Sequence, residues 1–428
     1  MGKMRYENVW EMTATPENNP DDTGTEVGED GLSCAIITDL DSITFLVKQG
    51  GKYPFRIILN EKDTVWGRFI GRYPKAHFTE GYKKENDGKT LIEIPKFYEL
   101  VNILMAITPT GVKDSGMINH DIDYFNQVQA YFKPFKSHKA VALMDSLLKK
   151  GMYFDIKMDA YAYDFNKQEI VEKKQAYNRI GWSNKNTITD YVSVFEDFAK
   201  TANFSVFYTK NKPFYLGLVR AYQDSLGVPE MQKWLNLNFP TMRYNCFKII
   251  FSPLVDADQS TTEFDNDDFK EGQPHVNFPF YWHSKKSKIS EKAVNIKRGN
   301  IVFTELNHLF ENAEFDKGEN GRLFGSIPFN LSLWADKNKA AGSYGNPRSC
   351  VEEYMNWALV SLRYVDFAPK KDLEILLTGN DDYMNRRGFT KFKAFNRFLV
   401  DAYTKRQKGQ VVADLYPSII NWFKENNK

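Results

Sequence analysis

Hydrophobic and polar positions change their spacing along the chain, and this change separates two structural regimes. Between residues 32 and 70, short apolar runs are separated by turn residues such as Gly50-Gly51, a pattern typical of a meander of β-strands. From about residue 97, apolar positions recur every three to four residues, which indicates helices. We therefore expect an α+β fold, with a β-rich portion at the N-terminus followed by a mainly helical, zincin-like portion that contains a small sheet.

The same pattern predicts the individual elements. In the N-terminal portion we expect strands at 35–37, 43–47, 55–59, 64–70 and 91–94. In the helical portion we expect helices at 97–107, 121–132, 137–150 (with Ser137 as N-cap), 187–201, 214–226, 231–235, 298–315, 350–364, 385–407 and 411–425. Residues 242–253 and 275–283 are predicted strands, whereas 255–274 and 316–348 are predicted loops.

The first residues have a different composition from the rest. Residues 12–31 are rich in Pro, Asp, Asn and Gly, which indicates an exposed loop or an arm. The expected domain organisation is therefore a flexible arm at 1–31, a β-rich domain at 32–96 and a mainly helical domain at 97–428.

Composition and charge exclude several classes of protein. Of the 428 residues, 42% are hydrophobic, which is enough for a sizeable core and too many for a disordered chain. The formal net charge is +2, from 57 basic and 55 acidic residues, and gives no reason to expect a nucleic-acid partner. The sequence contains no run of 18 apolar residues, so we expect no membrane-spanning helix.

The strongest candidate for chemistry is the predicted helix at 298–315, in the stretch Thr304-Glu305-Leu306-Asn307-His308. Glu305 and His308 are three residues apart and therefore lie on one face of a helix. Zinc metallopeptidases of the His-Glu-x-x-His type place two histidine ligands four residues apart, with a glutamate base beside the first. Thr304 stands in the position of the first histidine, so the motif is incomplete. The alternative interpretation is a surface glutamate and a hydrogen-bonded histidine.

A catalytic zinc ion needs about three protein ligands and an open position for water. Glu353, in a following predicted helix, is the natural third ligand, because apolar neighbours turn that part of the helix inward. Two schemes stay open. In one, Glu305 is the general base while His308 and Glu353 bind zinc; in the other, all three bind zinc and the base comes from elsewhere. Thr304 does not replace an imidazole, because a hydroxyl is a weak neutral ligand.

A few further side chains are candidate helpers or substrate contacts. His138 begins a predicted helix, and Tyr281 and His283 belong to an aromatic stretch. Each has a plain structural explanation as well: His138 as a capping or packing residue, and the aromatic stretch as a buried strand. The pair Arg386 and Arg387 either clamps a carboxylate of a ligand or forms ordinary ion pairs.

Several stretches resemble an uncharacterised family of secreted or envelope proteins from Bacteroides-type bacteria. The resemblance rests on residues 131–141, 303–308, 353–357, 387–389 and 413–417, and it spans roughly residues 30–425. The family looks like zincin-type metallopeptidases whose third ligand is a glutamate. It implies that Glu305, His308 and Glu353 cluster, that His138 lies near them, and that the protein is exported to the periplasm, envelope or medium. The start of this chain has no apolar signal core, so the residues alone leave two alternatives open: a cytoplasmic protein, or an exported one whose signal has been removed.

The expected function is a zinc-dependent peptidase, in which zinc activates water and polarises the scissile carbonyl of a peptide or protein substrate. The competing interpretation is a pseudo-enzyme of the same fold, which has lost its metal site and binds a protein or a glycan. The missing first histidine favours the competing interpretation. A structural envelope protein without cleft chemistry is a third one. Side-chain tips of His308 and Glu353 within about 4–5 Å of each other would suit a shared metal ion.

Overall fold

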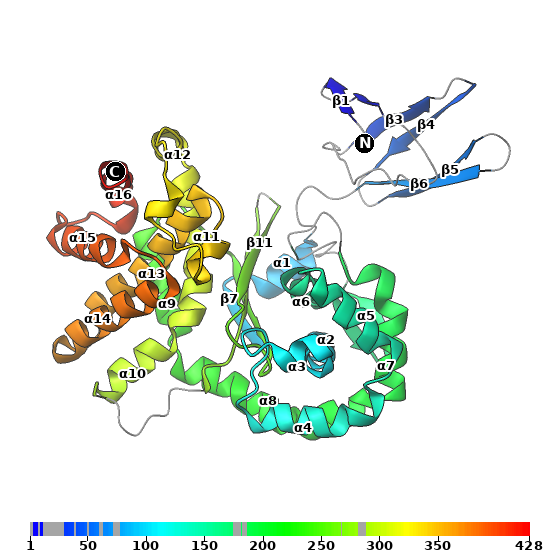
Figure 1. Cartoon of the computed structure of the whole chain (residues 1–428), viewed down its shortest axis with the longest axis horizontal. Helices are drawn as coiled ribbons and strands as arrows, with labels where there is room; N and C mark the ends of the chain where they lie inside the picture. Colours follow the sequence, from blue (N-terminus) through cyan, green and yellow to red (C-terminus); the bar gives the residue numbers. More distant parts are fainter. Residues whose placement is uncertain are drawn as a thin grey trace.

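The computed structural model describes residues 3–6, 9–11, 30–37, 40–48, 51–59, 63–71, 78–173, 181, 186–266, 268–280 and 288–428. Figure 1 shows a helical body with a sheet between two groups of helices, and the hairpins of the N-terminal residues outside that body. The α+β class predicted from the sequence is confirmed. Within the described ranges, no helix combines the length and the apolar character that crossing a bilayer requires.

The N-terminal portion consists of antiparallel hairpins; the alternating pattern predicts the two between residues 32 and 70, whereas the strands at 3–6 and 9–11 lie in the stretch expected to be an arm. They are β1 (Lys3–Tyr6) with β2 (Val9–Glu11), β3 (Leu32–Ile37) with β4 (Ser42–Val47), and β5 (Lys52–Leu59) with β6 (Asp63–Ile70). The inner face of β5–β6 packs Phe55 and Phe69 against Phe45 of β4, with ring centroids 5.2 Å apart for Phe55–Phe69 and 5.5 Å for Phe45–Phe69. Alternate residues of these strands therefore form a small aromatic core.

The central sheet joins strands that are distant in the sequence. It contains β7 (Lys89–Glu93), β10 (Cys246–Phe251), β11 (Ser260–Asp265) and β12 (Lys270–Val276), in the order β11-β12-β10-β7. β10 is parallel to both β7 and β12, and β11 is an antiparallel edge strand. The sequence pattern grouped β7 with the N-terminal strands, but β7 pairs with β10, a pairing that no local pattern reveals.

The two faces of this sheet differ in polarity. On one face, Phe247 stacks on Phe310 of helix α11 (Asn300–Asp316) with centroids 6.3 Å apart, and Gly272 leaves space for Leu309. The opposite face carries polar residues that are all buried: Lys248, Glu271, Gln273 and His275. Helix α11 therefore packs on the apolar face, as its predicted apolar stripe requires.

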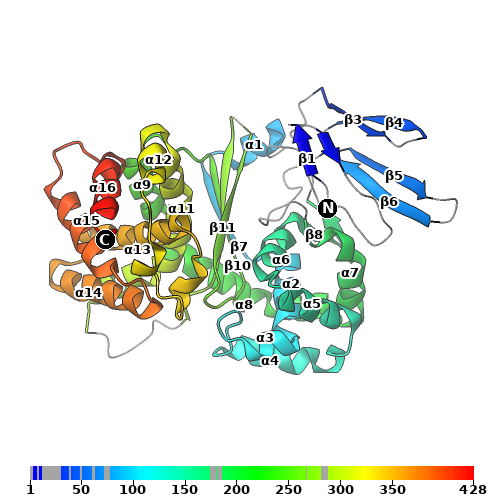
Figure 2. The ribbon, with the colours of Figure 1, turned by 45° about the horizontal axis from the view of Figure 1, so that its top comes forward.

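Two groups of helices flank the sheet (Figure 2). The group on the polar side contains α1 (Glu80–Asn86), α2 (Lys96–Ile107), α3 (Pro109–Lys113), α4 (Asp123–Phe132), α5 (Lys139–Lys149), α6 (Tyr153–Asp159) and α7 (Val192–Thr201), with the hairpin β8 (Tyr163–Asn166) and β9 (Glu169–Glu172). The long helix α8 (Phe204–Ser225) passes below the sheet in both views and leads to α9 (Val228–Asn238). The other group contains α10 (Glu291–Arg298), α11, α12 (Gly318–Gly325), α13 (Pro347–Phe367), α14 (Lys370–Arg387), α15 (Phe392–Lys405) and α16 (Tyr416–Glu425).

Most predicted helices are confirmed with shifted ends, but several local predictions are wrong. His138 rather than Ser137 caps α5, because the Nδ1 atom of His138 accepts the backbone amide of Ala140. The predicted loop at 255–274 contains β11 and most of β12, and the strand expected at 275–283 begins earlier, at Lys270. The predicted loop at 316–348 contains α12, and α14 was missed entirely. Strand β11 escaped prediction because it is an edge strand of mostly polar residues.

Gly299 joins α10 to α11 and sets the position of the candidate helix. A Cβ at this residue would lie 2.8 Å from the carbonyl oxygen of Leu226, which forces the backbone to move. We expect Gly299→Ala to destabilise the protein by about 1–3 kcal/mol, the usual effect of overpacking. Gly217→Ala in α8 is the matched control, because its Cβ meets open space, and it should stabilise the protein by about 0.5–1 kcal/mol. Chemical denaturation measures both changes; a Gly299→Ala protein as stable as the wild type would contradict tight packing at this junction.

Candidate functional site

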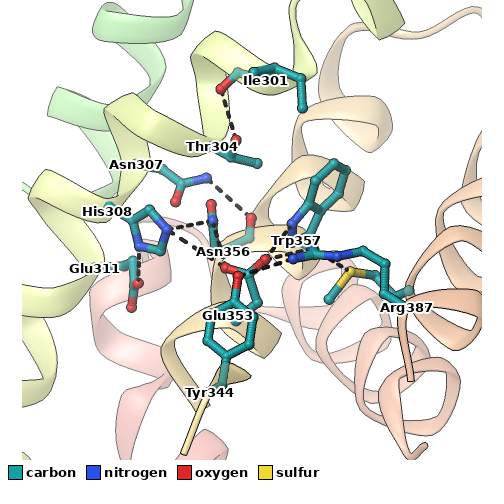
Figure 3. Close-up of polar contacts among 11 residues, drawn as sticks. Ile301, Thr304, Asn307, His308, Glu311, Tyr344, Glu353, Asn356, Trp357 and Arg387 are labelled. Atoms are coloured by element: carbon teal, nitrogen blue, oxygen red, sulfur yellow. Dashed lines mark hydrogen bonds and ion pairs between the residues drawn. The ribbon is translucent and has the colours of Figure 1, made fainter. Parts of the chain in front are cut away.

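The candidate site lies between α11 and α13, which pack against each other. Asn346 caps α13 by accepting the backbone amide of Ser349 at 2.9 Å, and Pro347 occupies the first helical position. Figure 3 shows His308 of α11 and Glu353 of α13 pointing toward each other. The Nε2 atom of His308 lies 3.7 Å from Oε2 of Glu353, which is below the upper limit of about 4–5 Å expected for two ligands of one ion.

Both ring nitrogens of His308 have partners inside the protein. Nδ1 lies 3.2 Å from Oε1 of Glu311, which follows one helical turn later in α11. Nε2 lies 2.7 Å from Nδ2 of Asn356, and the same amide nitrogen lies 3.4 Å from Oε2 of Glu353. The side-chain amide of Asn356 therefore lies beside both groups that were expected to hold a metal ion, within 3.4 Å of each.

Glu353 is buried and forms an ion pair. Its Oε1 atom accepts hydrogen bonds from Nη1 of Arg387 at 2.6 Å and from the indole nitrogen of Trp357 at 3.0 Å. Arg387 is the last residue of α14, where Gly388 adopts a left-handed conformation with φ +101° and ends the helix. Nη2 of Arg387 donates to the hydroxyl of Tyr344 at 3.0 Å. These contacts fix the position of the Glu353 carboxylate.

The carboxyl groups around His308 decide its charge. Burial alone would lower the pKa of His308, but its hydrogen bond to Glu311 and the nearby charges of Glu305 and Glu353 outweigh burial and raise this pKa to about 10. Burial also acts to raise the pKa of Glu353, yet Arg387 and His308 hold it below its usual value. The nearby carboxyl groups thus favour the imidazolium form of His308, whereas burial raises the pKa of Glu311, the partner of Nδ1, to about 8.

The side-chain amide of Asn356 can satisfy this imidazolium. An imidazolium bears a proton on both nitrogens, so Nε2 needs an acceptor. Oδ1 of Asn356 has no hydrogen-bond partner among the described residues, and it exchanges places with Nδ2 when the amide turns over. With the amide turned, Oδ1 accepts the proton of Nε2; in the orientation as placed, Nδ2 faces both Nε2 of His308 and the carboxylate of Glu353.

Thr304 and Glu305 are the other residues of the incomplete motif, and their surroundings differ from those of His308. The hydroxyl of Thr304 donates to the backbone carbonyl of Ile301 at 2.8 Å, within its own helix. Burial, with the charge of Glu353, raises the pKa of Glu305 to about 7, although the charges of His308 and Lys157 act in the opposite direction.

The charge partner of Glu305 from α6 is a buried lysine. The Nζ atom of Lys157 donates to the backbone carbonyl of Asp258 at 2.5 Å. Burial lowers the pKa of Lys157 to about 7, an effect that the charges of Glu305 and Asp258 partly offset. The charge of Lys157 therefore acts on Glu305, an influence that the sequence pattern did not suggest.

These residues do not fit a catalytic zinc site. Such a site needs about three protein ligands with donor atoms about 2.0–2.2 Å from the metal. Here Nε2 of His308 lies 2.7 Å from Nδ2 of Asn356, Oε1 of Glu353 is engaged by Arg387, and Thr304 directs its hydroxyl into its own helix. In the part of the chain that the structure describes, no three His, Cys, Asp or Glu side chains are grouped so as to hold a metal ion. Glu311 nevertheless contacts His308, and Arg387 contacts Glu353, in the way that neighbouring residues orient the ligands of a metal ion in metalloproteins.

The remaining predicted residues are not brought to this site by the described contacts. His138 caps α5, with Nε2 3.5 Å from Asp197 and its ring packed on Phe198, so its partners belong to α7. Tyr281 and His283 lie outside the described residues. Reasoning from the sequence missed Glu311 and Asn356, which sit one helical turn after His308 and Glu353. Helical spacing could have pointed to both.

A second polar cluster occupies the polar face of the sheet. The hydroxyl of Tyr82 donates to Oε2 of Glu271 at 2.5 Å, Gln273 donates to Oε1 at 2.6 Å, and Nζ of Lys248 lies 3.7 Å from Oε2. Burial holds the pKa of His275 well below its usual range, and within the described residues neither of its ring nitrogens has a hydrogen-bond partner. The period-two spacing of Glu271, Gln273 and His275 is the signal that would have revealed this buried strand.

Comparisons of the chain with protein-family models, with curated proteins and with solved structures found no match. The resemblance to zincin-type proteins therefore depends on the short motifs, and the function is inferred from the geometry between α11 and α13.

The charge of His308 predicts a pH-dependent contribution to stability. Its pKa of about 10 in the folded protein exceeds its ordinary value of about 6.5, so the stabilisation is fully present below pH 6.5 and is lost as the pH rises through about 10. We expect His308→Gln to lower the free energy of unfolding by about 3 kcal/mol near pH 6. This value is at the lower end for breaking a buried ion pair, because Glu353 keeps its ion pair with Arg387. The difference from wild type should shrink toward pH 10.

Urea denaturation between pH 6 and pH 10 measures this difference. Arg322→Gln is the control, because it removes only an exposed ion pair with Glu319 and should change little. A stability difference for His308→Gln that stays constant from pH 6 to pH 10 would show that His308 is not held in its charged form.

Proposed function

We propose that this chain is a non-hydrolytic binding protein built on a peptidase-like pair of helices, exported to the cell envelope or beyond, with a protein or a glycan as its partner. The observation that carries the proposal is the closed network around His308. Glu311, Asn356 and Glu353 contact its two ring nitrogens in the place where a peptidase would bind zinc.

The energetics of the network support a role without metal. His308 lies 3.2 Å from Glu311 and 3.7 Å from Glu353, and Arg387 lies 2.6 Å from Glu353, so both of these carboxyl groups have a basic partner inside the protein. A zinc ion would have to displace the proton of His308 and also the amide of Asn356. With Thr304 in place of the first histidine, too few ligands remain to offset these losses.

A zinc-dependent peptidase is the second candidate, and one distance favours it. The donor atoms of His308 and Glu353 lie 3.7 Å apart, so one ion placed between them would contact both. In that function His308 and Glu353 would hold the ion, which supplies an activated water, and Glu305 would accept a proton.

Zinc addition separates the two candidate functions. We expect the purified full chain to contain no stoichiometric zinc and to show no rise in melting temperature when zinc is added, because only binding to the native state would raise it. Thr304→His places an imidazole one helical turn before His308, and we expect this variant to gain a zinc-dependent rise in melting temperature. Elemental analysis and thermal unfolding measure both results.

The opposite outcome is equally specific. Stoichiometric zinc in the wild-type protein that is lost in His308→Ala, together with casein cleavage that Glu305→Gln abolishes, would establish the peptidase and overturn the proposal. His120→Ala is the matched control for loss of a histidine, because the His120 ring bonds the backbone carbonyl of Gly111 in the other group of helices.

A further inference from the structure

The hairpin β5–β6 presents an exposed face with an unusual composition. Trp66 is 68% exposed and Ile58 is 57% exposed. Arg56 stands directly opposite Trp66 in the register, and Arg68 follows two residues later on the same face. We use the name hairpin face for the exposed residues that share this side of the two strands: Pro54, Arg56, Ile58, Thr64, Trp66 and Arg68.

The register of the hairpin fixes Trp66 on the outside. The opposite face packs Tyr53, Phe55 and Phe69 around Phe45, with ring centroids between 5.2 Å and 6.3 Å apart. A shift of one residue would turn this aromatic core to the solvent, so the register is strongly specified. The exposed tryptophan is therefore a stable feature of the hairpin and is accessible to a partner, since the hairpin lies outside the helical body (Figure 1).

The two arginines are neighbours of Trp66 in the hairpin, one across the strand pair and one two residues along β6. Neighbouring strands are about 5 Å apart, and alternate residues of one strand about 7 Å, so both arginine side chains start close to Trp66. Among the side chains that the structure describes, neither Arg56 nor Arg68 has an ion-pair partner. Guanidinium groups bind carboxylates in a bidentate manner, and an indole offers a flat apolar surface with a polar edge.

We propose that the hairpin face binds an acidic polysaccharide, a chain of sugar rings that carries carboxylate groups at intervals. The indole of Trp66 stacks on the apolar side of a sugar ring, and the guanidinium groups of Arg56 and Arg68 bind carboxylates on either side of it. This inference names the partner class of the proposed binding role and rests on that role. It adds a surface that is separate from the network around His308.

Charge and composition favour this occupant over two others. A nucleic acid carries dense phosphate charge and is bound by strongly basic surfaces, whereas this chain has a net charge of only +2 and the hairpin face offers two cations. Insertion into a bilayer surface needs a continuous apolar face. The hairpin face instead places Arg56 and Thr64 next to its apolar residues.

Titration of the full chain with polygalacturonate, a polymer of uronic acid, tests the proposal by calorimetry. We expect Trp66→Ala and the double variant Arg56→Gln/Arg68→Gln each to weaken binding about tenfold or more, because each removes contacts worth at least one tenfold step in Kd. Binding should weaken as the salt concentration is raised. The wild type should bind neutral dextran no more tightly than the double variant binds polygalacturonate. Arg220→Gln, which removes an exposed arginine of α8, is the matched control and should bind like wild type.

Three outcomes would overturn the proposal: no binding of polygalacturonate by the wild type, equal binding by the hairpin variants, or variant-sensitive binding only to oligothymidylate or phosphatidylglycerol vesicles. Circular dichroism checks that the exposed substitutions leave the fold intact. Zinc content and casein cleavage do not depend on the hairpin face. A failure of this inference is therefore distinguishable from a failure of the non-hydrolytic function.

Discussion

Charge that is buried between α11 and α13 has to be neutralised within the protein, and the candidate site is arranged around this requirement. Removing an ion from water costs several kcal/mol unless a partner of opposite charge is close and hydrogen-bonded. His308 and Arg387 are the basic partners, and Glu311 and Glu353 are the acidic ones. Because these residues come from α11, α13 and α14, the packing of three helices and the chemistry of the site depend on each other.

The sheet determines which way the site faces. Phe310 and Leu309 of α11 pack against the apolar face through Phe247 and Gly272, and this contact fixes the rotation of the helix about its axis. His308 is then left on the side toward α13. The polar face of the same sheet holds a separate buried network around Glu271, so apolar packing and polar burial are divided between the two sides of one sheet.

The sequence was sufficient where the structure follows from local spacing. Helical spacing placed Glu305 and His308 on one face of one helix, and it turned Glu353 inward, as the structure has them. The alternation of apolar residues also predicted the hairpins between residues 32 and 70. These features depend on neighbours within one element, which a single sequence contains.

Other features depend on contacts between distant segments, and the sequence did not reveal them. The motif suggested a metal at His308. It could not show that Arg387 would donate a hydrogen bond to Glu353, or that the amide of Asn356 would lie beside the imidazole. The pairing of β7 with β10 brings together segments far apart in the chain. A motif names the residues that could bind an ion, whereas the tertiary structure decides whether their donor atoms are still free.

The proposed loss of metal chemistry depends on one property of the site, namely that His308 is held as an imidazolium by carboxylates. Nuclear magnetic resonance titration of the imidazole signals in metal-free protein, with His308→Gln to assign the resonance, measures this property directly. The account predicts a pKa for His308 well above its ordinary value and a signal that zinc does not change. A neutral His308 imidazole at pH 7 whose signal shifts when zinc is added would contradict it.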